Sequence, residues 1–293
     1  MTAIVTHRGL DPSKPNYYTE SSIEAFADQL ARGFGLEFDL RQSKDGVLVV
    51  SHDSNLKRLS GGHIDKEIED LTWEEMSKMD FRGSHLIDFD GLLNMISAVD
   101  DKRISAIHLK HQSQSKKIMD EVATKVGGDL KDKFIIFDLK PESAAYLKEK
   151  NKNLHLAASV SHPCDIERYN SCVGGTLISV KDVIKMRDLF DWVWLDEWDR
   201  KDFGEHDKTL YNRQVFDNLR GVGFKIALVS PELHGISPGL MGGEAHPDAS
   251  NSEILHSRMK EIAILQPDVV CTDFPDIFLD IVQGTEIIKL NKK

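Results

Sequence analysis

The chain lacks the features that mark membrane, secreted and disulfide-rich proteins. Among its 293 residues, no apolar run approaches the ~20 residues that a helix needs to span a bilayer. The opening sequence Met-Thr-Ala-Ile-Val-Thr-His-Arg-Gly has neither the basic region nor the apolar core of a secretory signal. Three cysteines, Cys164, Cys172 and Cys271, are too few for a disulfide framework and lack the second close pair that a zinc site uses. We therefore expect a cytoplasmic protein without a membrane span.

Positive charge is also scarce. The chain has 37 Lys and Arg against 48 Asp and Glu, a formal net charge of -11. An acidic surface repels polyphosphate, so nucleic acid is excluded as a general partner. A small phosphate-containing substrate would require positive charge concentrated locally, from a metal ion or a few Lys and Arg.

Hydrophobic residues make up 40% of the chain, which is enough for one large core. The sequence shows no low-complexity segment and no linker between domains. This composition suits a single domain over residues 1–293. Nine β-rich runs are visible: Ile4–Thr6, Gly35–Leu40, Val47–Ser51, Ser105–Leu109, Phe134–Asp138, Leu154–Val160, Trp192–Leu195, Phe224–Val229 and Val269–Thr272. Helical periodicity lies between many of them, at Ser22–Arg32, Phe89–Val99, Glu142–Lys150, Val180–Phe190, Leu210–Gly221 and Ser252–Leu265.

Alternating strands and helices predict an α/β fold with parallel strands, and about eight such units predict a TIM-type (β/α)8 barrel. One of the nine strand candidates is then an edge strand or not a strand at all. Residues 53–88, after the third strand, have weak strand signals and a Gly61-Gly62 pair, and we interpret them as a small insertion or a loop over the barrel mouth. Residues 230–251 contain three prolines and four glycines and are predicted to form a long functional loop.

Polar residues stand where successive predicted strands end, which is where barrel enzymes carry their catalytic groups. These residues are His7 and Arg8, Glu37 and Asp39, His52, and His108 and Lys110. Packing alone does not explain polar side chains at strand ends that follow one another along the chain. Their joint position predicts one active site in the barrel mouth.

Two carboxylates suggest a metal ion. Glu37 and Asp39 are two residues apart on a strand and share one face, where they repel each other unless a cation lies between them. Oxygen ligands favour Mg²⁺ or Ca²⁺. His7 and His52 come from different strands, so one could accept a proton from the nucleophile while the other donates a proton to the leaving oxygen.

Arg8 and Lys110 are candidate ligands of phosphate oxygens, Arg8 through its forked guanidinium. Other readings stay open for each residue taken alone. A single histidine at a strand end is more often structural, a Glu-x-Asp pair is more often a solvated face, and Arg8 could pair with Asp39 or Glu37.

The same residues resemble the glycerophosphodiester phosphodiesterase family, and they occur in the family's order. The opening His-Arg-Gly is His7-Arg8-Gly9, and Thr19–Phe26 resembles the Pro-Glu-Asn-Thr stretch that leads into the first helix. The Glu-x-Asp strand, the Asp-Gly turn, the His-Asp strand and the closing Thr-Asp-x-Pro correspond to Glu37-Phe38-Asp39, Asp45-Gly46, His52-Asp53 and Thr272-Asp273-Phe274-Pro275. The resemblance spans nearly the whole chain.

The resemblance implies that His7 and His52 are the general acid and base and that Glu37 and Asp39 bind a divalent metal. It also implies a role in lipid metabolism, with a glycerol phosphodiester hydrolysed to glycerol phosphate and an alcohol. Two other outcomes are compatible with these residues: a lyase that leaves a cyclic phosphate, and a phosphodiester-binding protein without activity.

Two departures from the family pattern stand out. The family's Glu-x-Lys on the fourth strand reads His108-Leu109-Lys110 here, so His108 is the expected third metal ligand and Asp138 the alternative. Because imidazole is neutral and softer than carboxylate, Mn²⁺ or another transition metal would be tolerated better. The family's Trp-Thr-Val-Asn-like stretch reads Leu-Val-Ser-Pro-Glu-Leu-His-Gly at residues 228–235, which predicts a different pocket for the alcohol.

Overall fold

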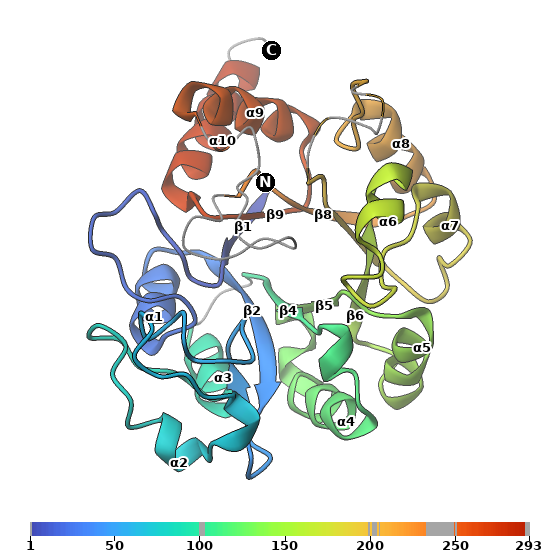
Figure 1. Ribbon diagram of the computed structural model, residues 1–293. Coiled ribbons are helices and arrows are strands. Elements are labelled where there is room, and N and C mark those ends of the chain that lie inside the picture. Colours follow the sequence, from blue (N-terminus) through green and yellow to red (C-terminus); the bar gives the residue numbers. More distant parts are fainter. Residues whose placement is uncertain are drawn as a thin grey trace.

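The computed structural model shows eight parallel strands, each paired with its neighbours, and the first strand also pairs with the last (Figure 1). This holds for the residues that the structure describes. These residues are 2–99, 103–198, 200, 204, 206–232, 249 and 251–290, with side chains up to residue 284 in the last helix. The barrel strands are β1 (Ala3–His7), β2 (Gly35–Gln42), β4 (Ser105–His108), β5 (Phe134–Phe137), β6 (His155–Val160), β7 (Trp192–Leu195), β8 (Lys225–Val229) and β9 (Val269–Thr272). Pairing of β1 with both β2 and β9 closes the barrel. The predicted TIM-type barrel is confirmed.

The barrel strands are apolar on both faces because both faces are covered. One buried cluster fills the barrel interior and includes Val5, Ala106, Ile135, Trp194 and Val269. A larger cluster includes residues of the strands and of the helices, and Figure 1 shows these helices arranged around the barrel. This arrangement leaves the carboxyl ends of the strands as the place where polar side chains can gather.

Helices occupy the outer layer between successive strands. They are α1 (Ile23–Ala31), α2 (Trp73–Met76), α3 (Phe89–Ser97), α4 (Lys116–Lys125), α5 (Pro141–Lys150), α6 (Pro163–Tyr169), α7 (Val180–Ile184), α8 (Arg213–Gly221), α9 (Ser252–Leu265) and α10 (Pro275–Leu290). Among the described residues, short 3₁₀ segments lie at Ile68–Asp70 and His111–Ser113, and a longer one lies at Gly128–Lys133.

The six predicted helices are confirmed, and in two of them one end is shifted by three residues or more. Helix α8 starts at Arg213, three residues later than expected, because the Asn212 side chain caps it by accepting a hydrogen bond from the Val215 N–H. Helix α7 ends at Ile184, six residues earlier than expected. Helices α2, α4, α6 and α10 were not predicted.

The third strand candidate is the one that does not belong to the barrel. Strand β3 (Leu48–Val50) pairs antiparallel with the outer half of β2, so its interpretation as a barrel strand was wrong. Only five residues join β2 to β3, whereas a parallel crossover needs a dozen or more. The Ser43 N–H donates to the Val47 carbonyl at 2.9 Å, and Gly46 has a φ of 85°, which closes a hairpin.

Residues 53–88 form an insertion with a small core of its own beside β2 and α3 (Figure 1). This core contains Leu56, Leu59, Ile68, Met76 and Phe81 among its buried members. None of residues 53–88 lines the central cavity described below.

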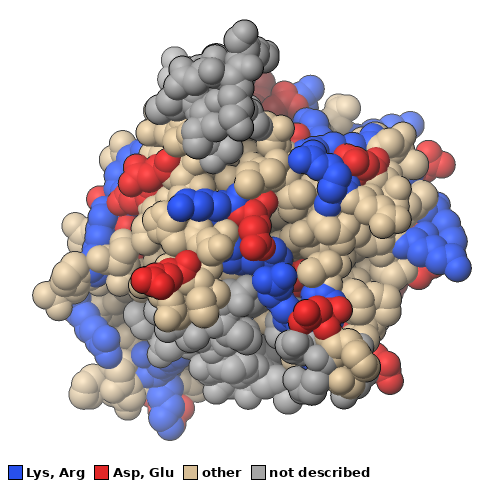
Figure 2. All heavy atoms as spheres, turned by 90° about the horizontal axis from the view of Figure 1, so that it is seen from above, with Lys and Arg blue, Asp and Glu red and all other residues tan. Residues whose placement is uncertain are grey.

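Charges of both signs are interspersed on the face drawn in Figure 2, and the described residues there form no basic expanse. None of the described helices is both long enough and apolar enough to cross a membrane.

Candidate active site

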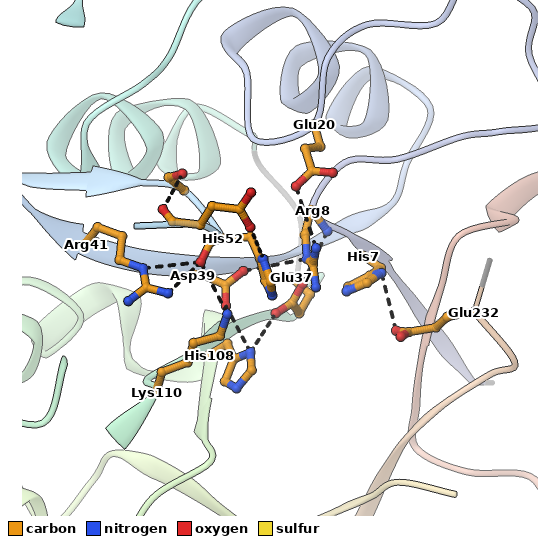
Figure 3. A network of polar contacts seen from close by, with 12 residues as sticks. His7, Arg8, Glu20, Glu37, Asp39, Arg41, His52, His108, Lys110 and Glu232 are labelled. Carbon is orange, nitrogen blue, oxygen red and sulfur yellow. Dashed lines mark hydrogen bonds and ion pairs between the residues drawn. The ribbon is translucent and has the colours of Figure 1, made fainter. Parts of the chain in front are cut away.

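A cavity of about 300 Å³ opens at the carboxyl end of the barrel. Six of the seven predicted site residues line it: His7, Arg8, Glu37, His52, His108 and Lys110. The seventh, Asp39, lies just beneath, 1% exposed, with one oxygen 3.1 Å from the Lys110 ammonium. Figure 3 shows His7 on one side of Glu37 and Asp39, with Arg41 and Lys110 on the other. The structure thus brings together all the residues that the sequence singled out.

The His7-Arg8-Gly9 sequence is a sharp turn at the exit of β1. Arg8 and Gly9 both have positive φ, 54° and 73°, and the Leu10 N–H donates to the His7 carbonyl at 2.9 Å. A positive φ costs an arginine about 1 kcal/mol or more. The turn leaves the His7 and Arg8 side chains buried in the mouth, 6% and 5% exposed.

Two carboxylates lie side by side at the end of β2. Glu37 Oε2 accepts a hydrogen bond from the Arg8 N–H at 3.2 Å, whereas the contacts of the buried Asp39 carboxylate are ion pairs. Burial and the neighbouring Asp39 charge raise the pKa of Glu37. Burial acts in the same direction on Asp39, but the charges of Lys110 and His108 outweigh it and hold the pKa of Asp39 well below its usual range.

His108 faces both carboxylates with one ring nitrogen. Its Nδ1 lies 3.0 Å from Asp39 Oδ1 and 3.7 Å from Glu37 Oε1. One potential ligand atom from each of the three residues lies within 4.8 Å of the other two, which is a spacing that a metal ion could bridge. The donor set fits this use, because carboxylate oxygens and an imidazole nitrogen are common metal ligands and the two buried carboxylates repel each other unless a cation lies between them.

Asp138, the alternative third ligand, lies on the far side of the His108 ring. Its Oδ2 is 3.2 Å from His108 Nε2. Burial disfavours the charged imidazole, but the Asp39 and Asp138 carboxylates outweigh burial and raise the pKa of His108 from 6.5 to about 9.

His7 is surrounded by carboxylates. Its Nδ1 donates to Asp273 Oδ1 at 2.9 Å and lies 3.3 Å from Glu232 Oε1. Burial and the Arg8 cation both disfavour the charged ring. The negative charges of Glu232 and, to a smaller extent, Asp273 outweigh them and raise the pKa of His7 from 6.5 to about 9. His7 is therefore protonated at neutral pH.

His52 has the opposite environment. Burial and the cations of Arg8 and Lys110 lower its pKa from 6.5 to about 2, against the charges of Asp39 and Asp53. Its Nδ1 donates to Asp53 Oδ1 at 2.7 Å, which leaves Nε2 as the free acceptor. His52 is therefore neutral at neutral pH.

The position of His52 depends on contacts from several elements. The Lys110 ammonium and the Arg41 guanidinium both donate to its backbone carbonyl, at 3.3 Å and 2.6 Å. Because β3 runs antiparallel to β2, it returns the chain to the level of Asp39, where the Ser51 N–H donates to the Asp39 carbonyl at 3.1 Å. This return path, rather than a barrel strand, brings His52 to the mouth.

A chain of ion pairs runs from His52 to Arg8. Asp53 Oδ2 accepts from Arg58 Nε at 2.6 Å, and Arg58 also donates to both oxygens of Glu20, at 2.7 Å and 2.9 Å. Glu20 in turn lies 3.6 Å from Arg8 Nη1. The Arg8 guanidinium is 3.8 Å from Asp39, and its Nε and Nη1 have no hydrogen-bond partner.

A sequence model of the glycerophosphoryl diester phosphodiesterase family matches residues 7–170, more than half of the chain. The chain belongs to this family. The match includes each of the seven predicted site residues.

Individual relatives agree with the family. A mouse lysophospholipase D is 39% identical over 74 residues, which are 25% of this chain and 21% of that protein. The matched segments amount to between 21% and 31% of the lengths of the three curated relatives.

Solved structures support the fold over almost the whole chain. A glycerophosphodiester phosphodiesterase from Thermotoga maritima has a TM-score of 0.61 at 23% identity, with 96% of this chain and 98% of that one covered. A phosphodiesterase from Oleispira antarctica, solved with its product sn-glycerol-3-phosphate, has a TM-score of 0.64 at 12% identity and 96% of each chain covered.

Three charged groups that contact the predicted site residues were not themselves predicted: Glu232 and Arg41, which line the cavity, and Asp273, which contacts His7. Each of them lies at or near the carboxyl end of a barrel strand. The criterion that identified the other site residues, a polar residue where a strand ends, therefore applies to them as well. Of the stretch 228–235, residues 233–235 lie outside the described residues, as do residues 233–248 and 250 of the predicted loop.

Proposed function

We propose that this protein is a metal-dependent phosphodiesterase that hydrolyses a glycerophosphodiester-like small molecule to a phosphomonoester and an alcohol. The observation that carries the proposal is the pairing in one cavity of a protonated His7 with a neutral His52, around the buried carboxylates Glu37 and Asp39. Family membership and the names of the relatives support the same reaction class.

Glu37, Asp39 and His108 would hold a divalent ion, which when bound supplies positive charge that polarises a phosphate oxygen. The sequence-based expectation of Mg²⁺ or Ca²⁺ stays a prediction. Glu37 and Asp39 would gain most from such an ion, because each buried carboxylate lies beside the other's negative charge.

His7 acts as the general acid in this proposal. Its Nδ1–H is held by Asp273 and Glu232, so the proton on Nε2 is the one available for the leaving alcohol oxygen. The two carboxylates keep the ring charged until it donates this proton.

His52 acts as the general base through Nε2, with Asp53 fixing the ring by its contact to Nδ1. The cations that depress its pKa, Arg8 and Lys110, are also the groups that face an incoming phosphodiester. A bound phosphate anion would offset their charge and raise the pKa of His52 toward the range in which a histidine accepts a proton efficiently.

Arg8 and Lys110 are proposed to bind the non-bridging phosphate oxygens. The Arg8 Nε and Nη1 groups are buried and make no hydrogen bond, so an anion that satisfies both would relieve the cost of leaving them unpaired. Lys110, two residues beyond the end of β4, lines the same cavity and donates to the His52 carbonyl.

The test is turnover of a diester panel that begins with glycerophosphocholine, with Mg²⁺, Ca²⁺ or Mn²⁺ added, followed by phosphorus NMR. We expect a phosphomonoester as the final product and a loss of turnover in His52→Ala. A panel without turnover would contradict the proposal, and full activity in His52→Ala would contradict the assigned base. A cyclic phosphate as the final product would identify a lyase instead.

A further inference from the structure

Asp138 is placed to control the ring of His108 without reaching the carboxylates itself. Its Oδ2 lies 3.2 Å from His108 Nε2, on the side of the ring opposite Glu37 and Asp39. A carboxylate that accepts Nε2–H leaves the lone pair of an imidazole on Nδ1. That nitrogen is the one 3.0 Å from Asp39.

The rest of the surroundings fix Asp138 in turn. The Thr176 hydroxyl donates to its second oxygen, and the Gln114 amide donates to its backbone carbonyl at 2.7 Å. Asp138 has a φ of 63°, a left-handed conformation that costs a non-glycine residue energy and that Asp and Asn tolerate best. Three independent features thus hold one carboxylate in one orientation.

Stacking fixes the plane of the His108 ring. The imidazole stacks on Phe137 with ring centroids 4.5 Å apart and an interplanar angle of 18°. Phe137 stacks in turn on Trp194 at 3.8 Å and 10°. With the plane set by this stack and the rotation set by Asp138, Nδ1 has little freedom to point away from Glu37 and Asp39.

We propose that Asp138 is a positioning residue that presents His108 Nδ1 as a metal ligand, and that the resulting site of two carboxylates and one imidazole favours a first-row transition ion over Mg²⁺ or Ca²⁺. This inference rests on the metal site of the proposed function and departs from the ions expected from the sequence. Imidazole suits transition ions, whereas Mg²⁺ and Ca²⁺ prefer oxygen ligands. A carboxylate behind a ligating histidine fixes the tautomer and increases the basicity of the ligand.

Binding of Co²⁺, Mn²⁺, Mg²⁺ and Ca²⁺ to the whole chain, measured by titration calorimetry, tests the preference. Pulsed EPR on the Mn²⁺ form reports whether a nitrogen is bound. In the wild-type protein we expect a coupled ¹⁴N and tighter binding of Co²⁺ and Mn²⁺ than of Mg²⁺. His108→Glu should remove the nitrogen coupling and lower the ratio of Co²⁺ to Mg²⁺ affinity.

The role of Asp138 is tested with Asp138→Asn, which tolerates the same backbone conformation. We expect Co²⁺ affinity to fall by about 10- to 100-fold. Thr176→Val is a second, milder variant in which affinity should fall less, so the test survives if the first variant folds poorly. Asp196→Asn, a carboxyl change in the same cavity, is the matched control and should leave the nitrogen coupling intact.

The outcomes separate this inference from the proposed function. An Asp138→Asn protein with wild-type Co²⁺ affinity, or a wild-type site without nitrogen coupling, overturns the inference even if diesters are hydrolysed. Metal binding that follows the expected pattern without turnover of any diester supports the inference and counts against the proposed activity.

Discussion

Replacing Glu232 by glutamine should move the alkaline limb of the pH profile, because Glu232 helps to keep His7 protonated. The pKa of His7 is raised to about 9, with Glu232 the largest favourable contribution and Asp273 next, against burial and the Arg8 cation. A group that acts as an acid works below its pKa, so activity should fall as pH rises through about 9.

The size of the shift follows from the distance. Glu232 Oε1 lies 3.3 Å from His7 Nδ1. Two unit charges about 4 Å apart interact by about 4 kcal/mol at an effective dielectric constant of about 20, which corresponds to a ceiling of about 3 pKa units. Because Asp273 remains and the surroundings can relax, we expect a shift of about 1 to 2 units, which moves the limb to roughly pH 7 to 8.

The assay is kcat/KM as a function of pH for the wild-type protein, Glu232→Gln and Asp273→Asn. Glu253→Gln, on the exposed first turn of α9, serves as the control. Glu232→Gln and Asp273→Asn should both move the limb to lower pH, and the control should not. An unchanged limb in Glu232→Gln, or a shift to higher pH, would refute the assignment of His7 as an acid held charged by Glu232.

Three further changes test other parts of the account. His52→Ala should lower kcat/KM by about 10²- to 10⁴-fold with folding unaffected, measured by product formation and circular dichroism. Asp39→Asn should abolish detectable divalent-ion binding in calorimetry, and metal-free protein should regain activity only when an ion is returned. Arg58→Leu should lower the free energy of unfolding in urea by about 2 kcal/mol, because Glu20 and Asp53 lose their shared partner. An unchanged free energy of unfolding in Arg58→Leu would contradict a structural role for the contacts of Arg58 with Glu20 and Asp53.

The barrel could be predicted because its signals are local. Each strand is a short apolar run and each helix has its own periodicity, so their alternation shows the fold without knowledge of any contact. The site residues His7, Glu37 and His108 could be found in the same way, since the ends of parallel strands must meet at one edge of the barrel.

The sequence placed His52 among the site residues, and it does line the cavity, but the strand that leads to it was interpreted incorrectly. The sequence shows the Asp45-Gly46 turn, which signals a hairpin, but an apolar run such as Val47–Ser51 reads the same in a parallel or an antiparallel strand. Only the length of the connection excludes the parallel arrangement. Chain length between two strands is therefore as informative as the strands themselves.

The partners of His7 could not be chosen from the sequence. Asp273 is 266 residues away and reaches His7 because the barrel closes between β1 and β9. Glu232 stands near a strand end like several other acidic residues, and nothing local distinguishes it from Glu197, which instead forms a buried ion pair with Arg258. Which acidic residue contacts His7 depends on the direction of each side chain and on the register of the strands around the closed barrel.

The most direct test of the central claim is hydrolysis of glycerophosphocholine in water enriched in ¹⁸O, with Mn²⁺ present and phosphorus NMR as the readout. The account predicts a phosphomonoester that carries one ¹⁸O in the phosphate, and no product from Asp39→Asn. Absence of product from the wild-type protein, label in the alcohol rather than the phosphate, or full activity in Asp39→Asn would contradict it.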